Sequence, residues 1–205
     1  MEPIRFVGLA EAAELARQTD RMIVIGCSGS GKSTLAQKAA ALLDLPYISI
    51  DRDVLWLPGW ILRERAEQRR LTEELIARDR WIMDGTGSST LSLRLPRTEL
   101  IIWPDLPRFA CVLGILRRWV ANLGRTRPEM TPGCPEKIDL EFLRYVWTWN
   151  REVRPRVLAD IQNHASGKPV VMLKSYREMD EFLRLVNKSP TRFSPPHGEP
   201  VEPRG

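Results

Sequence analysis

The residues best suited to chemistry stand together in one short stretch, residues 26–34, "GCSGSGKST". Gly26, Gly31, Lys32 and Ser33 satisfy the spacing G-x-x-x-x-G-K-[ST]. In that pattern backbone N–H groups surround phosphates, the lysine reaches the β- and γ-phosphates, and the hydroxyl ligates Mg²⁺. A chance glycine-rich turn is the alternative, but an apolar run precedes the motif and a helical pattern follows it. The sequence therefore predicts a nucleotide site, with ATP and Mg²⁺ as ligands, formed by Gly26, Ser28, Gly29, Ser30, Gly31, Lys32, Ser33 and Thr34.

Two aspartates stand at the ends of predicted strands. Asp51 follows "YISI" and Asp84 follows "WIM". Ligands in parallel α/β sheets bind at the carboxyl ends of the strands, where such a carboxylate can hold a Mg²⁺-bound water. We expect Asp84 to take this role first and Asp51 second, while Asp53 orients or deprotonates an acceptor hydroxyl. The alternative is that these acids cap the next elements or pair with surface arginines.

Cations stand in a segment that has the composition of a lid. Arg117 lies near the end of a predicted helix, and Arg125 and Arg127 lie in the Gly/Pro-rich loop at 124–138. Mobile arginines neutralise charge on a transferring phosphoryl group, so we expect these three to act in catalysis. A solvated basic face is the alternative.

An aromatic loop follows Asp53 and can wall off a substrate pocket. Trp56 and Trp60 flank "LPG" and can stack on an acceptor, although core packing is equally compatible with the sequence. We expect Arg94 to face the acceptor as well.

Strand-like and helical segments alternate along the chain, which predicts a parallel sheet covered on both faces. The expected strands are 21–25, 45–51, 80–85, 98–105 and 168–174. The expected helices are 8–18, one beginning after Lys32, 61–79, 107–122, 139–163 with a kink or break at Pro155, and 176–187. Residues 53–60 and 124–138 read as loops.

Bulk composition suits one globular domain, with 205 residues, 43% hydrophobic content and a formal charge of +5. No apolar run reaches membrane-spanning length, no export signal is visible, and three scattered cysteines favour a reducing cytoplasm. We expect an N-terminal helical extension at 1–20, a kinase-like domain at 21–187 with its lid at about 117–156, and a disordered tail at 188–205.

Several segments together resemble the bacterial family of DNA topology modulation proteins. They include "VIGCSGSGKSTLA", "SIDRDVLWLPGW", "IIWPDLPR" and "GCPEKIDLEFLRYVW". The resemblance implies a three-layer P-loop NTPase fold near adenylate kinase, with five parallel strands in the order 2-3-1-4-5. It places Lys32 and Ser33 at the phosphates and Mg²⁺, Asp84 at the second acidic motif, and Arg117, Arg125 and Arg127 at lid positions. Family members tend to have Asn-Tyr where this chain has Thr86-Gly87, which predicts an altered acceptor pocket.

Two functions follow from these observations. The first is transfer of the γ-phosphoryl group of ATP to a small acceptor, with a nucleotide or nucleoside as candidate, by a monomer or homodimer without a membrane partner. The second is a regulatory nucleotide-binding protein that contacts DNA through its basic helices and has little turnover. The scarcity of lysine in the basic clusters, and their overlap with the lid, favour the first.

Overall fold

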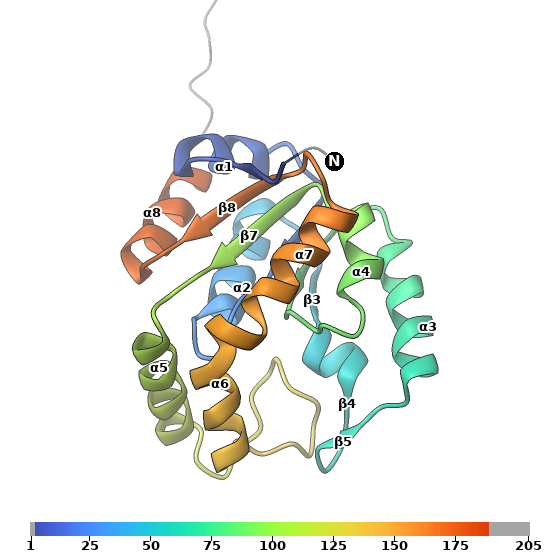
Figure 1. The fold of residues 1–205 in the computed structure, drawn as a ribbon, viewed down its shortest axis with the longest axis vertical. Helices are drawn as coiled ribbons and strands as arrows, with labels where there is room; N and C mark the ends of the chain where they lie inside the picture. The colour runs from blue at the N-terminus through green and yellow to red at the C-terminus, as the bar shows by residue number, and fades with distance from the viewer. Residues whose placement is uncertain (1–2, 189–205) are drawn as a thin grey trace, which may run out of the picture.

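A computed structural model describes residues 3–188 of the chain, and Figure 1 shows its central sheet between two helical layers. All pairings in this sheet are parallel, and its strand order is β1-β8-β7-β2-β6-β3. The strands are β1 (Arg5–Phe6), β2 (Arg21–Val24), β3 (Tyr47–Ser49), β6 (Trp81–Asp84), β7 (Leu100–Pro104) and β8 (Pro169–Leu173).

The predicted three-layer P-loop fold is confirmed, and the five expected strands lie in the predicted order 2-3-1-4-5 as β3-β6-β2-β7-β8. The strand count was wrong, because the described sheet has a sixth strand. β1 pairs Arg5 with Pro169 and Phe6 with Val170 at the sheet edge. β1 has only two residues, and both are exposed. So short a segment cannot show the alternation of apolar and polar side chains that predicts a strand.

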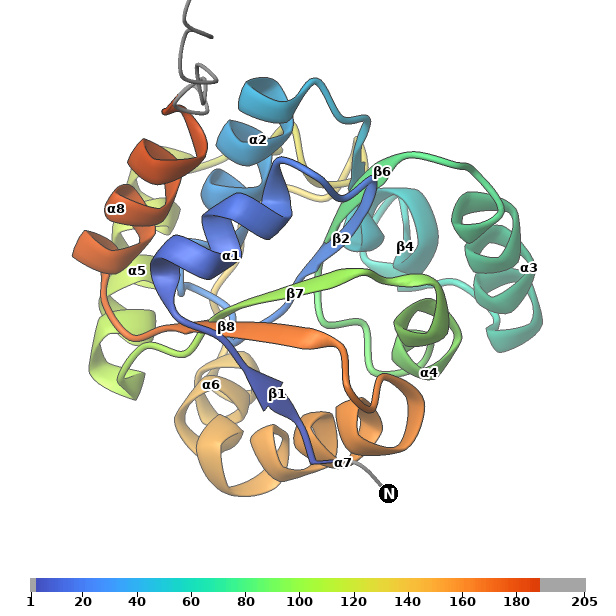
Figure 2. The same ribbon diagram turned by 90° about the horizontal axis from the view of Figure 1, so that it is seen from above.

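Alternating side chains of the buried strands build one core on each face of the sheet. Met22 and Val24 of β2 join the first core, while Ile23 joins the second. The first core lies under α1 (Leu9–Ala16), α2 (Lys32–Leu43) and α8 (Tyr176–Val186). The second lies under α4 (Leu91–Arg94), η2 (Leu95–Arg97) and α7 (Arg154–His164), with α3 (Arg65–Ile76) at its border. Figure 2 shows the two helical groups on opposite sides of the sheet.

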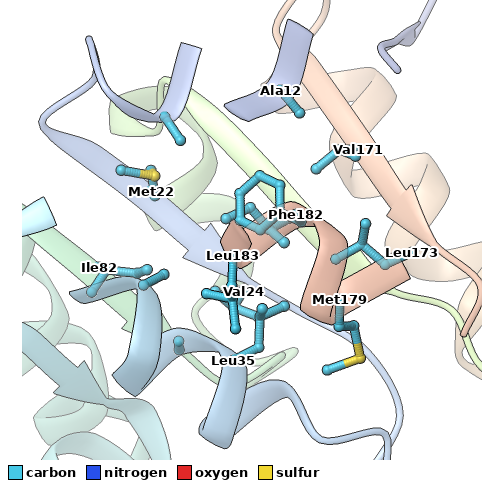
Figure 3. Close-up of a cluster of buried hydrophobic side chains, with 14 of the residues drawn as sticks. Ala12, Met22, Val24, Leu35, Ile82, Val171, Leu173, Met179, Phe182 and Leu183 are labelled. Carbon is cyan, nitrogen blue, oxygen red and sulfur yellow. The ribbon is translucent and has the colours of Figure 1, made fainter. Parts of the chain in front are cut away.

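The first core fixes the position of the helix that follows the phosphate motif. Figure 3 shows Leu35 of α2 beside Val24 and the α8 side chains Met179 and Leu183. Leu35 is 1% exposed and Val24 is fully buried. Because interiors are close-packed, this contact holds the N-terminus of α2 at the end of β2.

Two segments differ from the elements expected, and a third has the break that was expected. Residues 53–60 are not an open loop: a π-helical turn η1 (Asp51–Leu55) leads into a hairpin of β4 (Trp56–Leu57) and β5 (Ile61–Leu62). The helix expected at 61–79 therefore begins only at Arg65. The break expected at Pro155 is confirmed: the helical pattern at 139–163 forms two helices, α6 (Leu140–Glu152) and α7, because Pro155 has no N–H to continue α6. Before them, α5 (Arg108–Ala121) fits its predicted bounds.

The N-terminal segment packs on the domain: β1 extends the sheet, and α1 lies along α8. The predicted disordered tail lies outside the described residues, except Lys188. Between residues 3 and 188, no helix combines the length and apolar content needed to cross a membrane.

Candidate phosphoryl-transfer site

The glycine-rich turn between β2 and α2 has a backbone that side chains would obstruct. Gly26 has φ 148°, and a Cβ there would lie 2.6 Å from the carbonyl oxygen of Pro104. Gly29 has φ 80°, and its Cβ would lie 2.1 Å from the carbonyl oxygen of Cys111. The two positions require glycine because of the positive φ and because neighbouring backbone approaches so closely.

Helix α2 begins where this turn ends, with Lys32 and Ser33 as its first residues. Its N-cap, Gly31, provides no side-chain cap, so the first N–H groups of the helix are available to an anion. Gly26, Ser28, Lys32 and Ser33 line a cavity of about 520 Å³. The other four predicted ligand residues do not line it: Gly29 packs against α5, Ser30 is fully buried, Gly31 lies against Tyr176 and Met179, and Thr34 is exposed.

Asp84 ends β6 next to this turn and is only 4% exposed. Its Oδ2 accepts a hydrogen bond of 3.0 Å from the phenol of Tyr47, while Oδ1 has no hydrogen-bond partner among the described residues. Burial raises the pKa of Asp84, and the nearby Lys32 ammonium and Ser33 hydroxyl oppose that shift. A buried carboxylate oxygen without a partner, beside a lysine and a serine, fits a position for a metal-bound water.

The available oxygen donors suit Mg²⁺ held jointly with a nucleotide. Within residues 3–188, no three His, Cys, Asp or Glu side chains gather into a metal site of their own. Mg²⁺ in phosphotransferases is usually held by one or two protein oxygens together with substrate phosphates and water. Ser33 and Asp84 are residues of that type, so the chain fits Mg²⁺ bound with phosphate.

The two aspartates after β3 have different surroundings. Asp51 lines the cavity. Asp53 lies outside the lining: its Oδ2 accepts a 3.0 Å hydrogen bond from the backbone N–H of Ser49, and Arg52 donates to both carboxylate oxygens at 2.7 and 2.9 Å. The structure therefore brings Asp51, and not Asp53, to the reacting space.

Two arginines of the predicted lid region enter the cavity, and they share one acid. Arg118 and Arg127 line the cavity and form ion pairs with opposite oxygens of Glu136, whose side chain is 3% exposed. Arg127 also pairs with Glu129 at 2.9 Å. Burial lowers the pKa of Arg118, and Arg127 adds to the shift, but an arginine stays charged in proteins. These two planar cations can contact phosphate oxygens in bidentate fashion.

The other two predicted lid arginines face away from the cavity lining. Arg117 and Arg125 are exposed, on the last turns of α5 and in the loop that follows. Arg127 is thus the one predicted lid arginine that this structure places in the cavity, and Arg118 takes the place expected for Arg117.

The β4–β5 hairpin supplies the aromatic wall of the cavity. Trp56 and Trp60 line it, with ring centroids 5.4 Å apart in an edge-to-face arrangement. Trp60 donates from Nε1 to the carbonyl oxygen of Pro135 at 3.1 Å, and the ammonium of Lys137 lies 5.2 Å from its ring centroid. Both predicted aromatic residues therefore face the cavity, fixed by contacts with the loop before α6.

The loop after Asp84 is shaped by two polar side chains. Thr86 Oγ1 accepts from the N–H of Gly26 and donates to its carbonyl oxygen, both at 3.0 Å. Arg94, fully buried, donates to the carbonyl oxygens of Gly85, Thr86 and Gly87. Burial lowers the pKa of Arg94 to about 10. Arg94 does not line the cavity but holds the loop that does, through Thr86, Gly87 and Ser88.

Sequence reasoning assigned no role to several residues of the cavity. Phe142 and Tyr145 of α6 line it, as does Glu136. These three come from a helix and a loop whose approach to the glycine-rich turn no local pattern encodes. Arg118 belongs with Arg117 to the predicted lid cations, and only its spacing to the buried Ile115 and Cys111 indicates that it, rather than Arg117, faces inward.

We compared the chain with known protein families and its fold with solved structures. No protein-family model matches the chain. A shikimate kinase from Acinetobacter baumannii in complex with shikimate aligns with 85% of this chain and 94% of its own, at 13% identity and TM-score 0.51. The chain shares the fold of P-loop kinases.

Two further solved structures are similar at lower scores. A shikimate kinase from Aquifex aeolicus aligns with 80% of this chain and 91% of its own, at 15% identity and TM-score 0.45. A gluconokinase from Sinorhizobium meliloti 1021 aligns with 82% and 89%, at 16% identity and TM-score 0.45. The resemblance to DNA topology modulation proteins remains a hypothesis.

Proposed function

We propose that this protein is an ATP- and Mg²⁺-dependent phosphotransferase that transfers the γ-phosphoryl group of ATP to a small acceptor. One observation carries the proposal. A single cavity is lined at one end by Lys32 and Ser33 of the glycine-rich turn, and elsewhere by Trp60, Arg127 and Tyr145 from distant segments. A nucleotide-binding turn alone would not need this second set of side chains.

Each group then has a role that follows from its position. The turn and the α2 N-terminus hold the donor phosphates, with Lys32 as the fixed charge. Mg²⁺, when bound, would neutralise charge on the transferred group, and Ser33 and Asp84 would hold it. Arg118 and Arg127 stabilise negative charge that develops on the phosphoryl oxygens. Asp51 lies in the cavity where it can accept a proton from the acceptor hydroxyl.

The acceptor remains a small molecule whose candidates include nucleotides and nucleosides. Trp56 and Trp60 offer an aromatic edge for a base or another ring. Three buried, unbridged cysteine thiols fit the reducing, cytoplasmic setting that we propose.

The decisive experiment measures ADP formation from ATP and Mg²⁺ with a panel of nucleotides, nucleosides and small hydroxy acids or sugars. We expect turnover with one chemical class, and a loss of about 10²–10³-fold in kcat/KM for Lys32→Ala. Lys38→Ala is the matched control, because Lys38 is exposed on the same helix. Absence of transfer and hydrolysis, with unchanged ATP affinity in Lys32→Ala, would refute the proposal.

The resemblance to topology modulation proteins supplies a second candidate, a nucleotide-binding regulator that contacts DNA. Its support is weaker, because two exposed arginines of α3 are paired with acids. Arg69 pairs with Glu73, and Arg70 pairs with Glu67 and Glu74. DNA binding that weakens steeply with salt would support this function, and no binding at low salt would exclude it.

A further inference from the structure

We propose that Tyr47 is a positioning residue for the metal site, because its phenol fixes the Asp84 carboxylate so that one oxygen stays free for a Mg²⁺-bound water. This inference rests on the proposed function. The two residues come from neighbouring parallel strands. Tyr47 of β3 stands opposite Ile82 of β6, two residues before Asp84. Since side chains alternate along a strand, Ile82 and Asp84 face the same side, which is the side that Tyr47 reaches.

The hydrogen bond divides the carboxylate into two unlike oxygens. Oδ2 accepts from the phenol at 3.0 Å, and Oδ1 has no hydrogen-bond partner among the described residues. Without the phenol, rotation about the Cβ–Cγ bond of Asp84 would exchange the two carboxylate oxygens. With it, the orientation of Oδ1 is fixed before the metal arrives. Hydrogen bonds of this kind to metal-ligating groups typically alter metal affinity or activity by about 10–100-fold.

The phenol is suited to act as a permanent donor. A phenol keeps its proton at neutral pH, so the O–H is a hydrogen-bond donor to the Asp84 carboxylate. The aromatic ring itself is only partly buried and lines a second, open cavity with Gln37, Asp44 and Arg52. Tyr47→Phe therefore removes the inward hydroxyl and leaves the packing of the ring unchanged.

The test separates metal binding from phosphate binding. Calorimetry with a non-hydrolysable ATP analogue gives the dissociation constant with and without Mg²⁺, and their ratio is the factor by which Mg²⁺ tightens binding. For Tyr47→Phe we expect the Mg²⁺-free constant to stay within about twofold, and the ratio to fall by about tenfold or more. Tyr176→Phe is the comparison, because that phenol contacts the carbonyl oxygen of Gly29 rather than Asp84. It should leave the ratio unchanged.

A double-variant cycle excludes a general structural effect. In an Asp84→Ala background, Tyr47→Phe should no longer change the ratio, because the carboxylate that the phenol orients is gone. An unchanged ratio in Tyr47→Phe alone, or an equal loss with and without Mg²⁺, would overturn the inference while leaving the proposed function intact. If the native protein binds no ATP analogue under either condition, the proposed function fails, and the inference fails with it.

Discussion

The two ends of the cavity are built in different ways. The donor end comes from one continuous stretch, and its main features are backbone N–H groups, the glycine dihedral angles and a helix N-terminus. The other end is assembled from side chains of the β4–β5 hairpin, α5, the loop before α6, and α6 itself. Its two arginines, Arg118 and Arg127, are already paired within the protein, with Glu136.

For the proposed phosphotransferase, this difference predicts where binding and selectivity reside. Backbone groups recognise phosphate irrespective of what it is attached to, so the donor end defines a class of ligand. Side chains from several segments recognise one molecule, so the other end decides the acceptor. Variants at the donor end should thus affect every substrate alike, whereas variants at the other end should act through the acceptor or the transfer step.

The largest expected effect distinguishes the two aspartates after β3. Asp51→Asn should lower kcat by about 10²–10⁴-fold, because Asp51 faces the cavity and can accept a proton. Asp53→Asn should retain most of its activity, because Asp53 is bonded to Ser49 and Arg52. Steady-state kinetics at saturating ATP check this. The opposite ranking would return the acceptor-orienting role to Asp53, as the sequence predicts.

Next in size is the effect of the cavity arginines. Arg118→Ala and Arg127→Ala should each lower kcat by about 10²–10³-fold, with little change in ATP affinity. Exposed Arg117 and Arg125 serve as controls, and their alanine variants should stay close to the native rate. An equal loss in Arg117→Ala would show that the lid closes further than in this structure.

Removal of Arg127 also leaves the buried Glu136 with one partner fewer, which lowers stability independently of catalysis. The variant Arg127→Ala/Glu136→Gln removes that carboxylate charge together with the arginine. If its melting temperature recovers but its rate stays low, the loss of rate belongs to the arginine.

A moderate effect should come from the aromatic wall. Trp60→Leu should raise the KM for the acceptor by about tenfold and leave the dissociation constant for ATP unchanged, because the contacts of the ring are with Pro135, Lys137 and Trp56. Trp147→Leu is the control, since Trp147 is 43% exposed on α6 and does not line the cavity. A change in ATP affinity instead would place Trp60 at the donor end.

The smallest expected effect concerns the contact between α5 and the glycine-rich turn. A Cβ at Gly114 would lie 2.2 Å from the carbonyl oxygen of Gly29. In a helix interior, glycine to alanine normally stabilises by about 1 kcal/mol, but overpacking costs about 1–3 kcal/mol. Gly114→Ala should therefore lower the free energy of unfolding and weaken ATP binding several-fold, as measured by denaturation and calorimetry. A more stable variant would show that the two backbones separate easily.

Local sequence was sufficient where function depends on neighbouring residues. Strand, glycine-rich turn and helix follow one another in the chain, so the motif at residues 26–34 predicted this local structure, and the pattern before Asp84 predicted its place at a strand end. The strand order agreed because the fold of P-loop kinases fixes it. β1 was missed because two exposed residues carry no period, and they become a strand only by pairing with β8.

Tertiary structure alone decided which side chains enter the cavity. Adjacent Arg117 and Arg118 are equivalent in sequence, but packing of Cys111 and Ile115 turns α5 so that Arg118 faces inward. The sequence likewise does not show which of Asp51 and Asp53 enters the cavity. A π-helical turn places Asp51 in the cavity lining, while Asp53 is bonded to Arg52. Helix rotation and turn geometry depend on contacts with distant segments, and a local pattern of residue types does not contain that information.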